Sequence, residues 1–195
     1  MTDIQKDAPA NAHVESAPTS IGSLQVPLGD DPEFQAHASE VLGRFRRMCP
    51  PGQAPVLTIL RVHLLTEYYI ERLLTMSLPR GDKLTEDANL SYAQKLAILD
   101  SLKVLDDQHT QALRALNRVR NSCAHEMDRD ITLSDVERIG SPLGPTFTTL
   151  RRQFANDIES LLTETLSDLT QTLTYHIWQV ESEVAARHKK RTPEP

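Results

Sequence analysis

The sequence is poor in cysteine and glycine. Its two cysteines, Cys49 and Cys123, form neither a disulfide framework nor a CxxC metal-binding pair, so we expect two reduced thiols in a cytoplasmic protein. Glycine occurs only 7 times in 195 residues, whereas leucine, alanine, glutamate and arginine are abundant. Because those four residue types have good helix propensities and glycine does not, the composition favours an all-α fold.

Long apolar runs are also missing. No run reaches the roughly 18 apolar residues that a membrane-spanning helix needs, and the N-terminus lacks a basic region followed by an apolar core. We therefore expect neither a membrane span nor a secretory signal.

Several familiar catalytic and cofactor motifs do not occur in the sequence. It has no glycine-rich phosphate loop, no HExxH, no GxSxG and no Cys/His zinc spacing, so no cofactor and no metal is expected. The net charge of −6 argues against nucleic-acid binding over the whole surface, although it leaves room for a local basic patch. No helix-turn-helix signature is evident, so we do not expect direct reading of DNA.

The remaining features are those of one globular domain with tails. The chain has 39% apolar and 25% charged residues, and its length suits a single domain. Residues 1–30 are rich in Ala, Pro, Ser, Asp and Gln, which predicts a disordered leader. Residues 31–186 form the predicted helical domain, and residues 187–195 form a basic, mobile tail.

Apolar residues at helical spacing predict the helices of this domain. The first covers residues 32–48, with Asp31 as its N-cap. The second covers residues 55–77, and its apolar face comprises Leu57, Leu60, Leu64, Ile70, Leu73 and Leu74. A polar loop follows at residues 81–89. The third helix covers residues 90–102, with Tyr92, Leu96, Leu99 and Leu102 facing inward.

Two more helices are predicted in the centre of the chain. A helix over residues 107–127 can be capped by Asp106 or Asp107. The run Thr132-Leu-Ser-Asp135 resembles a capping box with aspartate in place of glutamate, and it opens a short helix that ends at Ile139.

The last predicted element, residues 146–186, is a long helix. Its apolar residues recur at a mean spacing of about 3.7, which is a helical stripe and not a strict heptad. A continuous helix of this length would span on the order of 60 Å at 1.5 Å per residue, more than a compact domain of this size. It must therefore break near the Thr-rich stretch 163–174 or extend beyond the core. Packing on its own bundle and contact with a partner both remain open.

One short stretch near the end of the central helix carries side chains that could take part in a reaction. Its residues are Arg120-Asn121-Ser122-Cys123-Ala124-His125. Asn121 and His125 are four residues apart and share a helix face, which Arg120 borders. An arginine can hold a phosphate through two parallel hydrogen bonds. A histidine can move a proton near neutral pH.

This stretch resembles the R-N-x-x-A-H form of the Rx4-6H motif of the HEPN superfamily. The apolar-periodic lead-in over residues 113–119 is also similar, and the likeness is closest to the mannitol-operon-repressor-like branch. The resemblance covers about residues 54–140. It implies a helical bundle of about five to six helices with a long C-terminal helix.

The resemblance also implies a function, that of a metal-independent endoribonuclease, either a toxin or a defence effector. Two copies of the motif would meet across a homodimer, and the ribose 2′-hydroxyl would attack the adjacent phosphate and leave a cyclic phosphate. Carried over to this chain, His125 would transfer the proton, Arg120 would hold the phosphate, and Asn121 would orient the site. Glu67, Arg114 and Arg118 are candidate supporting residues.

A second interpretation needs no reaction. Arg120 could pair with Glu67 or Glu126, and His125 could complement the negative end of the helix dipole. The protein would then be a non-catalytic transcriptional regulator or a protein-interaction scaffold. The two interpretations imply different partners: RNA and an antitoxin for the enzyme, and another protein for the scaffold.

Overall fold

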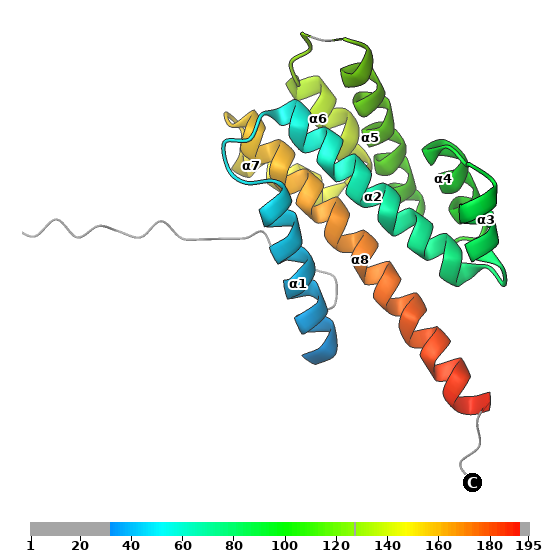
Figure 1. Cartoon of the computed structure of the whole chain (residues 1–195). Coiled ribbons are helices and arrows are strands. Elements are labelled where there is room, and N and C mark those ends of the chain that lie inside the picture. Colours follow the sequence, from blue (N-terminus) through cyan, green and yellow to red (C-terminus); the bar gives the residue numbers. More distant parts are fainter. Residues whose placement is uncertain (1–31, 127, 192–195) are drawn as a thin grey trace, which may run out of the picture.

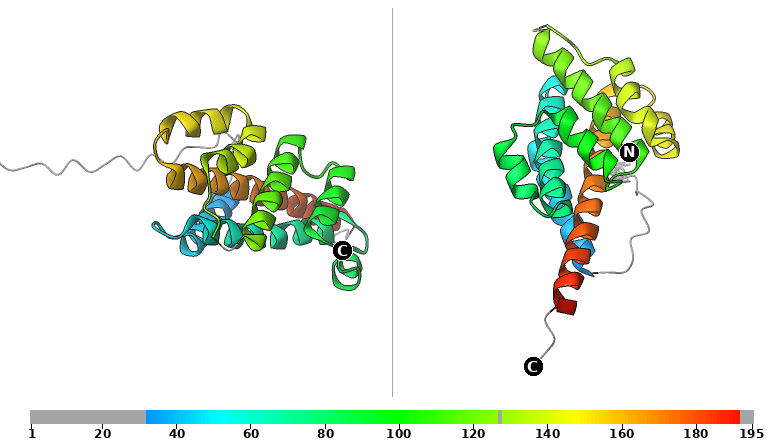
Figure 2. Two further views of the ribbon diagram at one scale, coloured as in Figure 1. Left: turned by 90° about the horizontal axis from the view of Figure 1, so that it is seen from above. Right: turned by 90° about the vertical axis from the view of Figure 1, so that its right-hand side faces the viewer.

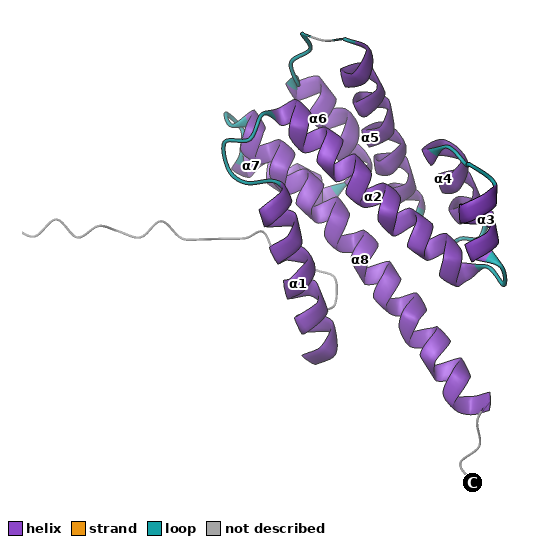
Figure 3. Cartoon of the chain, in the orientation of Figure 1, coloured by secondary structure: helices purple, strands orange, loops and turns teal. Residues whose placement is uncertain are grey.

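The computed structural model of the chain describes residues 32–126 and 128–191, with side chains described up to residue 184. The predicted leader (1–30) and the predicted cap Asp31 lie outside the described residues, as do the final residues 192–195 of the predicted tail. Every regular element in the described ranges is helical (Figure 3), which confirms the all-α prediction. None of these helices has the length and apolarity required to cross a bilayer.

Eight α-helices and one short 3-10 helix make up the described chain, compared with the five to six helices expected. They are α1 (Pro32–Met48), α2 (Pro55–Ser77), α3 (Gly81–Asp87), α4 (Tyr92–Ser101), α5 (Asp107–His125), α6 (Leu133–Gly140), η1 (Ser141–Leu143), α7 (Pro145–Gln153) and α8 (Ile158–Arg191). The extra helices arise in two places. Helix α3 occupies the predicted polar loop, and the last predicted helix divides into α7 and α8.

Helices α2 and α8 lie side by side through the centre of the molecule (Figures 1 and 2). Helix α1 packs on α8, whereas α4 and α5 pack on α2, and α6 and α7 also contact α8. The C-terminal turns of α8 extend past the neighbouring helices, at the lower end of Figure 1. The long helix was predicted either to break near residues 163–174 or to extend beyond the core. One end of α8 does extend beyond the core.

The break in the last segment lies at residues 154–157, and not in the Thr-rich stretch 163–174. Asp157 causes a new helix to start there, because its Oδ1 accepts the backbone N–H of Ser160 at 3.0 Å. The Thr-rich stretch stays helical although several of its threonines are buried. Their hydroxyls donate to carbonyl oxygens one turn earlier, as Thr165 does to Leu161 at 2.7 Å and Thr170 to Leu166 at 2.8 Å.

The core confirms most of the predicted apolar stripes and corrects others. Apolar residues along α8 are buried as expected, including Leu161, Leu166, Leu169, Leu173 and Ile177. On α2, however, Leu57 and Leu64 are 40% and 61% exposed, and Leu102 after α4 is 41% exposed. Helix α2 is covered by α8 on one side and by α4 and α5 on another, so its remaining face points to solvent whatever residues it carries.

Helix α8 also buries a carboxylate. Asp168 is 7% exposed, and burial together with the neighbouring charge of Glu164 raises its pKa to about 6. Burial also raises the pKa of Glu164, although the charge of Arg46 on α1 acts to lower it. At neutral pH the protein therefore holds an ionised aspartate in a site that favours the protonated form.

Asp168→Asn is expected to raise the free energy of unfolding by about 1–2 kcal/mol at pH 7 and by less as the pH falls toward 4. Between pH 3.8 and about 6 the native chain binds more protons than the unfolded chain, so the stability of the parent falls as the pH rises through this window. Urea unfolding of both proteins at several pH values measures the difference. Asp157→Asn is the control, because asparagine caps a helix as well as aspartate. An equal gain from Asp168→Asn at every pH would contradict the assignment.

Candidate functional site

The three predicted catalytic residues lie at the C-terminal end of α5, at the top of Figure 1. Asn121 and His125 are exposed, and Arg120 is half-buried. Arg120 Nη1 donates to Asn121 Oδ1 at 3.1 Å, so the amide positions the guanidinium. His125 has no hydrogen bond or ion pair with the residues that the structure describes. Its imidazole is therefore open to a ligand.

Helix α5 presents a row of polar side chains to solvent. Arg114, Arg118, Asn121 and His125 follow one another at spacings of four, three and four residues, and all are exposed. We call these four residues the outer face of α5. Arg114 pairs with Asp100 at 2.9 Å, and Arg118 has no ion pair within the described chain. The predicted supporting arginines thus share a face with two of the three predicted catalytic residues.

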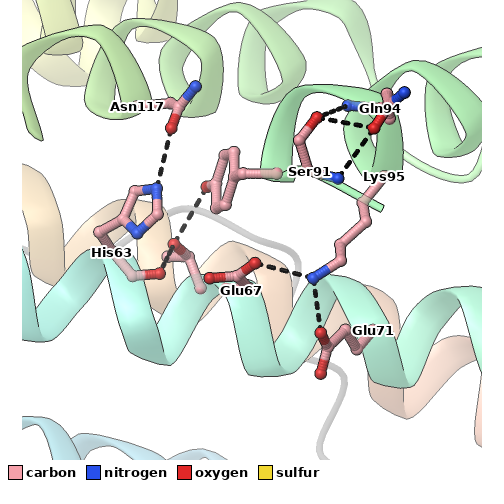
Figure 4. Close-up of polar contacts among 9 residues, drawn as sticks. His63, Glu67, Glu71, Ser91, Gln94, Lys95 and Asn117 are labelled. Atoms are coloured by element: carbon pink, nitrogen blue, oxygen red, sulfur yellow. Dashed lines mark hydrogen bonds and ion pairs between the residues drawn. The ribbon is translucent and has the colours of Figure 1, made fainter. Parts of the chain in front are cut away.

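Arg120 flanks the outer face of α5 on the side of α2. Its charge is close enough to contribute to lowering the pKa of His63, a buried residue of α2. The larger cause of that lowered pKa is burial, so His63 is neutral at physiological pH. Its Nε2–H donates to Asn117 Oδ1 at 3.0 Å (Figure 4). Because Asn117 lies one turn before Asn121, this bond fixes how α5 is rotated against α2.

His63 also contacts Tyr92 of α4. The His63 ring stacks on Tyr92 with 4.3 Å between ring centroids, and the Tyr92 hydroxyl bonds to Thr66 Oγ1 at 3.0 Å. These side chains come from α2 and α4, and Asn117 from α5, so the network ties three helices together (Figure 4).

Glu67, a predicted supporting residue, is held by a partner that sequence reasoning did not identify. The buried Lys95 of α4 donates to Glu67 and Glu71 at 2.7 and 2.6 Å (Figure 4). Burial acts to lower the pKa of Lys95, but the two carboxylates outweigh it and raise the pKa above its ordinary value. Lys95 therefore stays charged, and Glu67 acts in an ion cluster with Glu71.

Neither internal pairing suggested for Arg120 occurs in the described chain. Glu67 pairs with Lys95, and Glu126 pairs with Arg129 at 3.2 Å. Arg129 also donates to the buried Asp135 at 2.8 Å. Asp135 in turn belongs to the predicted capping box with Thr132, which the structure confirms. The chain that leaves the motif is thus tied to the start of α6.

The arrangement suits binding of an anion such as a phosphate. Arg118 and Arg120 supply guanidinium groups near Asn121, and His125 supplies a group that can accept or release a proton. One α5 helix carries a single histidine at this end, since the other histidine of the helix, His109, lies at its beginning. A reaction that needs both a base and an acid would require a second such group.

Two other surface features were not predicted as functional. Leu57, Leu64 and Tyr68 expose apolar side chains on one face of α2, spaced seven and four residues apart. A cavity of about 410 Å³ lies between α1 and α8, where Arg46, Cys49 and Glu164 line it. The cavity contains none of the predicted site residues.

Other known proteins give no further guide to the site. Comparison of the chain with known protein families, with curated proteins and with solved structures finds no match. The resemblance to the HEPN superfamily over about residues 54–140 therefore rests on the sequence, above all on the motif and its lead-in within α5.

Proposed function

We propose that this protein is a metal-independent endoribonuclease of the HEPN type, acting as a toxin or defence effector. The observation that supports this best is the accessibility of the motif: Asn121 and His125 are exposed, and Arg120 bonds to Asn121 instead of to a carboxylate. A structural arginine would be expected to pair internally. Here the nearby carboxylates Glu67 and Glu126 have other partners.

In the proposed reaction the 2′-oxygen of a ribose attacks the adjacent phosphorus. The bond from phosphorus to the 5′-oxygen breaks, which leaves a 2′,3′-cyclic phosphate and a 5′-hydroxyl. His125 takes or gives a proton in this exchange, while Arg120 stabilises the charge that develops on the phosphate oxygens. A second copy of the chain, related by a two-fold axis, would supply the second histidine.

A second candidate is a non-catalytic regulator or scaffold of the mannitol-repressor-like kind. The exposed apolar side chains of Leu57, Leu64 and Tyr68 favour it, because such a row suits contact with another protein. This candidate requires no chemistry from His125.

The deciding experiment compares the purified protein with its His125→Ala variant on pooled tRNA and mRNA with EDTA present. We expect the parent to produce fragments with cyclic phosphate ends and the variant to produce none. Arg152→Ala is the matched control, because Arg152 is exposed on α7, away from the motif. No cleavage by the parent, with a stable dimer in solution, would reject the nuclease and favour the scaffold.

A further inference from the structure

A second group of titratable side chains lies at the other end of α5, where this helix meets α8. Asp106 precedes α5, His109 is in its first turn, and His176 comes from α8. One donor atom from each residue lies within 4.8 Å of the other two. Asp106 Oδ2 is 2.6 Å from His109 Nδ1 and 3.8 Å from His176 Nε2, so this oxygen lies between two imidazole nitrogens.

The three side chains also have the donor atoms that a metal cation requires. Two imidazole nitrogens and one carboxylate oxygen form a donor set that Zn²⁺ and related transition metals prefer.

We infer that Asp106, His109 and His176 bind a divalent transition-metal ion, with Zn²⁺ as the representative ion. In a tetrahedral site, bonds of about 2.0–2.1 Å place neighbouring ligand atoms about 3.3 Å apart. The contact of 2.6 Å must therefore lengthen by about 0.7 Å and the contact of 3.8 Å must shorten by about 0.5 Å. The two imidazole nitrogens, which lie within 4.8 Å of each other, must likewise approach to about 3.3 Å. The Asp106 side chain is 49% exposed, which leaves an open side for a water molecule as fourth ligand.

The site would join two helices that are far apart in the sequence. His176 comes from α8, the helix that extends past the rest of the bundle in Figure 1. The ion would hold α8 against the start of α5. His109 and His125 are 16 residues apart on one helix, or roughly 24 Å at 1.5 Å per residue. The metal site is thus separate from the motif, and its occupancy is compatible with metal-independent cleavage there.

Without a metal, the same contacts would have a simpler role. Asp106 is the N-cap of α5, with Oδ1 accepting the backbone N–H of His109 at 2.9 Å. Its second oxygen, Oδ2, accepts a hydrogen bond from Nδ1–H of the His109 ring at 2.6 Å. The capping role requires only Asp106 and the backbone of His109, whereas metal binding requires both imidazoles. Substitutions of the two histidines therefore separate the two roles.

The test is calorimetric titration of the untagged, full-length, EDTA-treated and dialysed protein with ZnCl₂. We expect saturable binding of one ion per chain. In thermal unfolding, zinc should raise the midpoint temperature by several degrees. His109→Gln and His176→Gln should each lower the affinity at least tenfold and remove the rise in the midpoint. Asp106→Asn should do the same while keeping the cap, because asparagine is also a good N-cap.

His125→Ala is the matched control, since it removes an exposed histidine from the opposite end of α5 and should leave zinc affinity unchanged. Equal binding by the parent and the His176→Gln variant would overturn the inference. Weak, unsaturable binding that every histidine substitution reduces slightly would also overturn it. Neither measurement involves RNA, so the zinc result does not depend on whether the protein cleaves RNA.

Discussion

In the proposed endoribonuclease, Arg120→Lys is expected to lower the rate of RNA cleavage by about 10²–10³-fold, the usual cost of losing one donor to a developing oxyanion. The charge survives this change, but the geometry does not. Arg120 uses one N–H to bond Asn121 Oδ1 at 3.1 Å, and its remaining N–H groups have no other side-chain partner among the described residues, so they can meet a phosphate. A lysine ammonium is a compact point charge and cannot reproduce this planar arrangement of donors.

Single-turnover kinetics on a short RNA would measure this loss. The fall should appear mainly in the cleavage rate constant at saturating protein, because the contact strengthens as charge develops on the phosphate. Arg152→Lys makes the same chemical change on the exposed surface of α7 and should leave the rate as it was. If Arg120→Lys kept the parental rate while Arg120→Gln lost it, the arginine would act through its charge alone, and the two parallel hydrogen bonds to the phosphate would be wrong.

Gly81→Ala is expected to lower the free energy of unfolding by about 3 kcal/mol, at the upper end of the range for overpacked sites. A Cβ at Gly81 would lie well within the van der Waals contact distance of the Leu74 carbonyl oxygen and 2.6 Å from Thr75 Cα. Both are backbone atoms of α2, so no rotamer change can make room. Helix α3 would have to move away from α2.

Chemical denaturation measures this change, and Gly43→Ala provides the control with the opposite sign. Gly43 lies inside α1, where an added Cβ would meet only the flexible end of Arg47 at 3.4 Å. Alanine there should stabilise the protein by about 0.5–1 kcal/mol, because it has a higher helix propensity. A loss below 1 kcal/mol from Gly81→Ala would mean that α3 is not firmly packed on α2.

Helices with clear start or stop signals in the sequence could be predicted. The bounds of α2 match the prediction because a proline opens the helix and Leu78-Pro79 follows its end. The capping box at Thr132 likewise located the start of α6. The break before α8 was missed because the apolar stripe continues in phase across it. The cap at Asp157 was the signal that could have revealed this break.

In the candidate site, too, some residues could be predicted from local sequence and others could not. The residues of the outer face of α5 are close in sequence, so helical spacing was enough to group them. Lys95 and His176 reach their partners from other helices, at sequence distances of 28 residues from Glu67 and 70 from Asp106. No local pattern encodes such contacts. Equally, periodicity could not tell which face of α2 would stay uncovered, because that depends on where α4, α5 and α8 pack.

The ties of Arg129 to Glu126 and Asp135 have a consequence for ligand binding. They fix the chain on the C-terminal side of His125, while the His63–Asn117 bond fixes α5 on the N-terminal side. The motif is therefore preorganised: the conformational entropy of ordering it is lost during folding and not on binding. A ligand at this end of α5 should accordingly bind with little change in backbone order between the free and bound states.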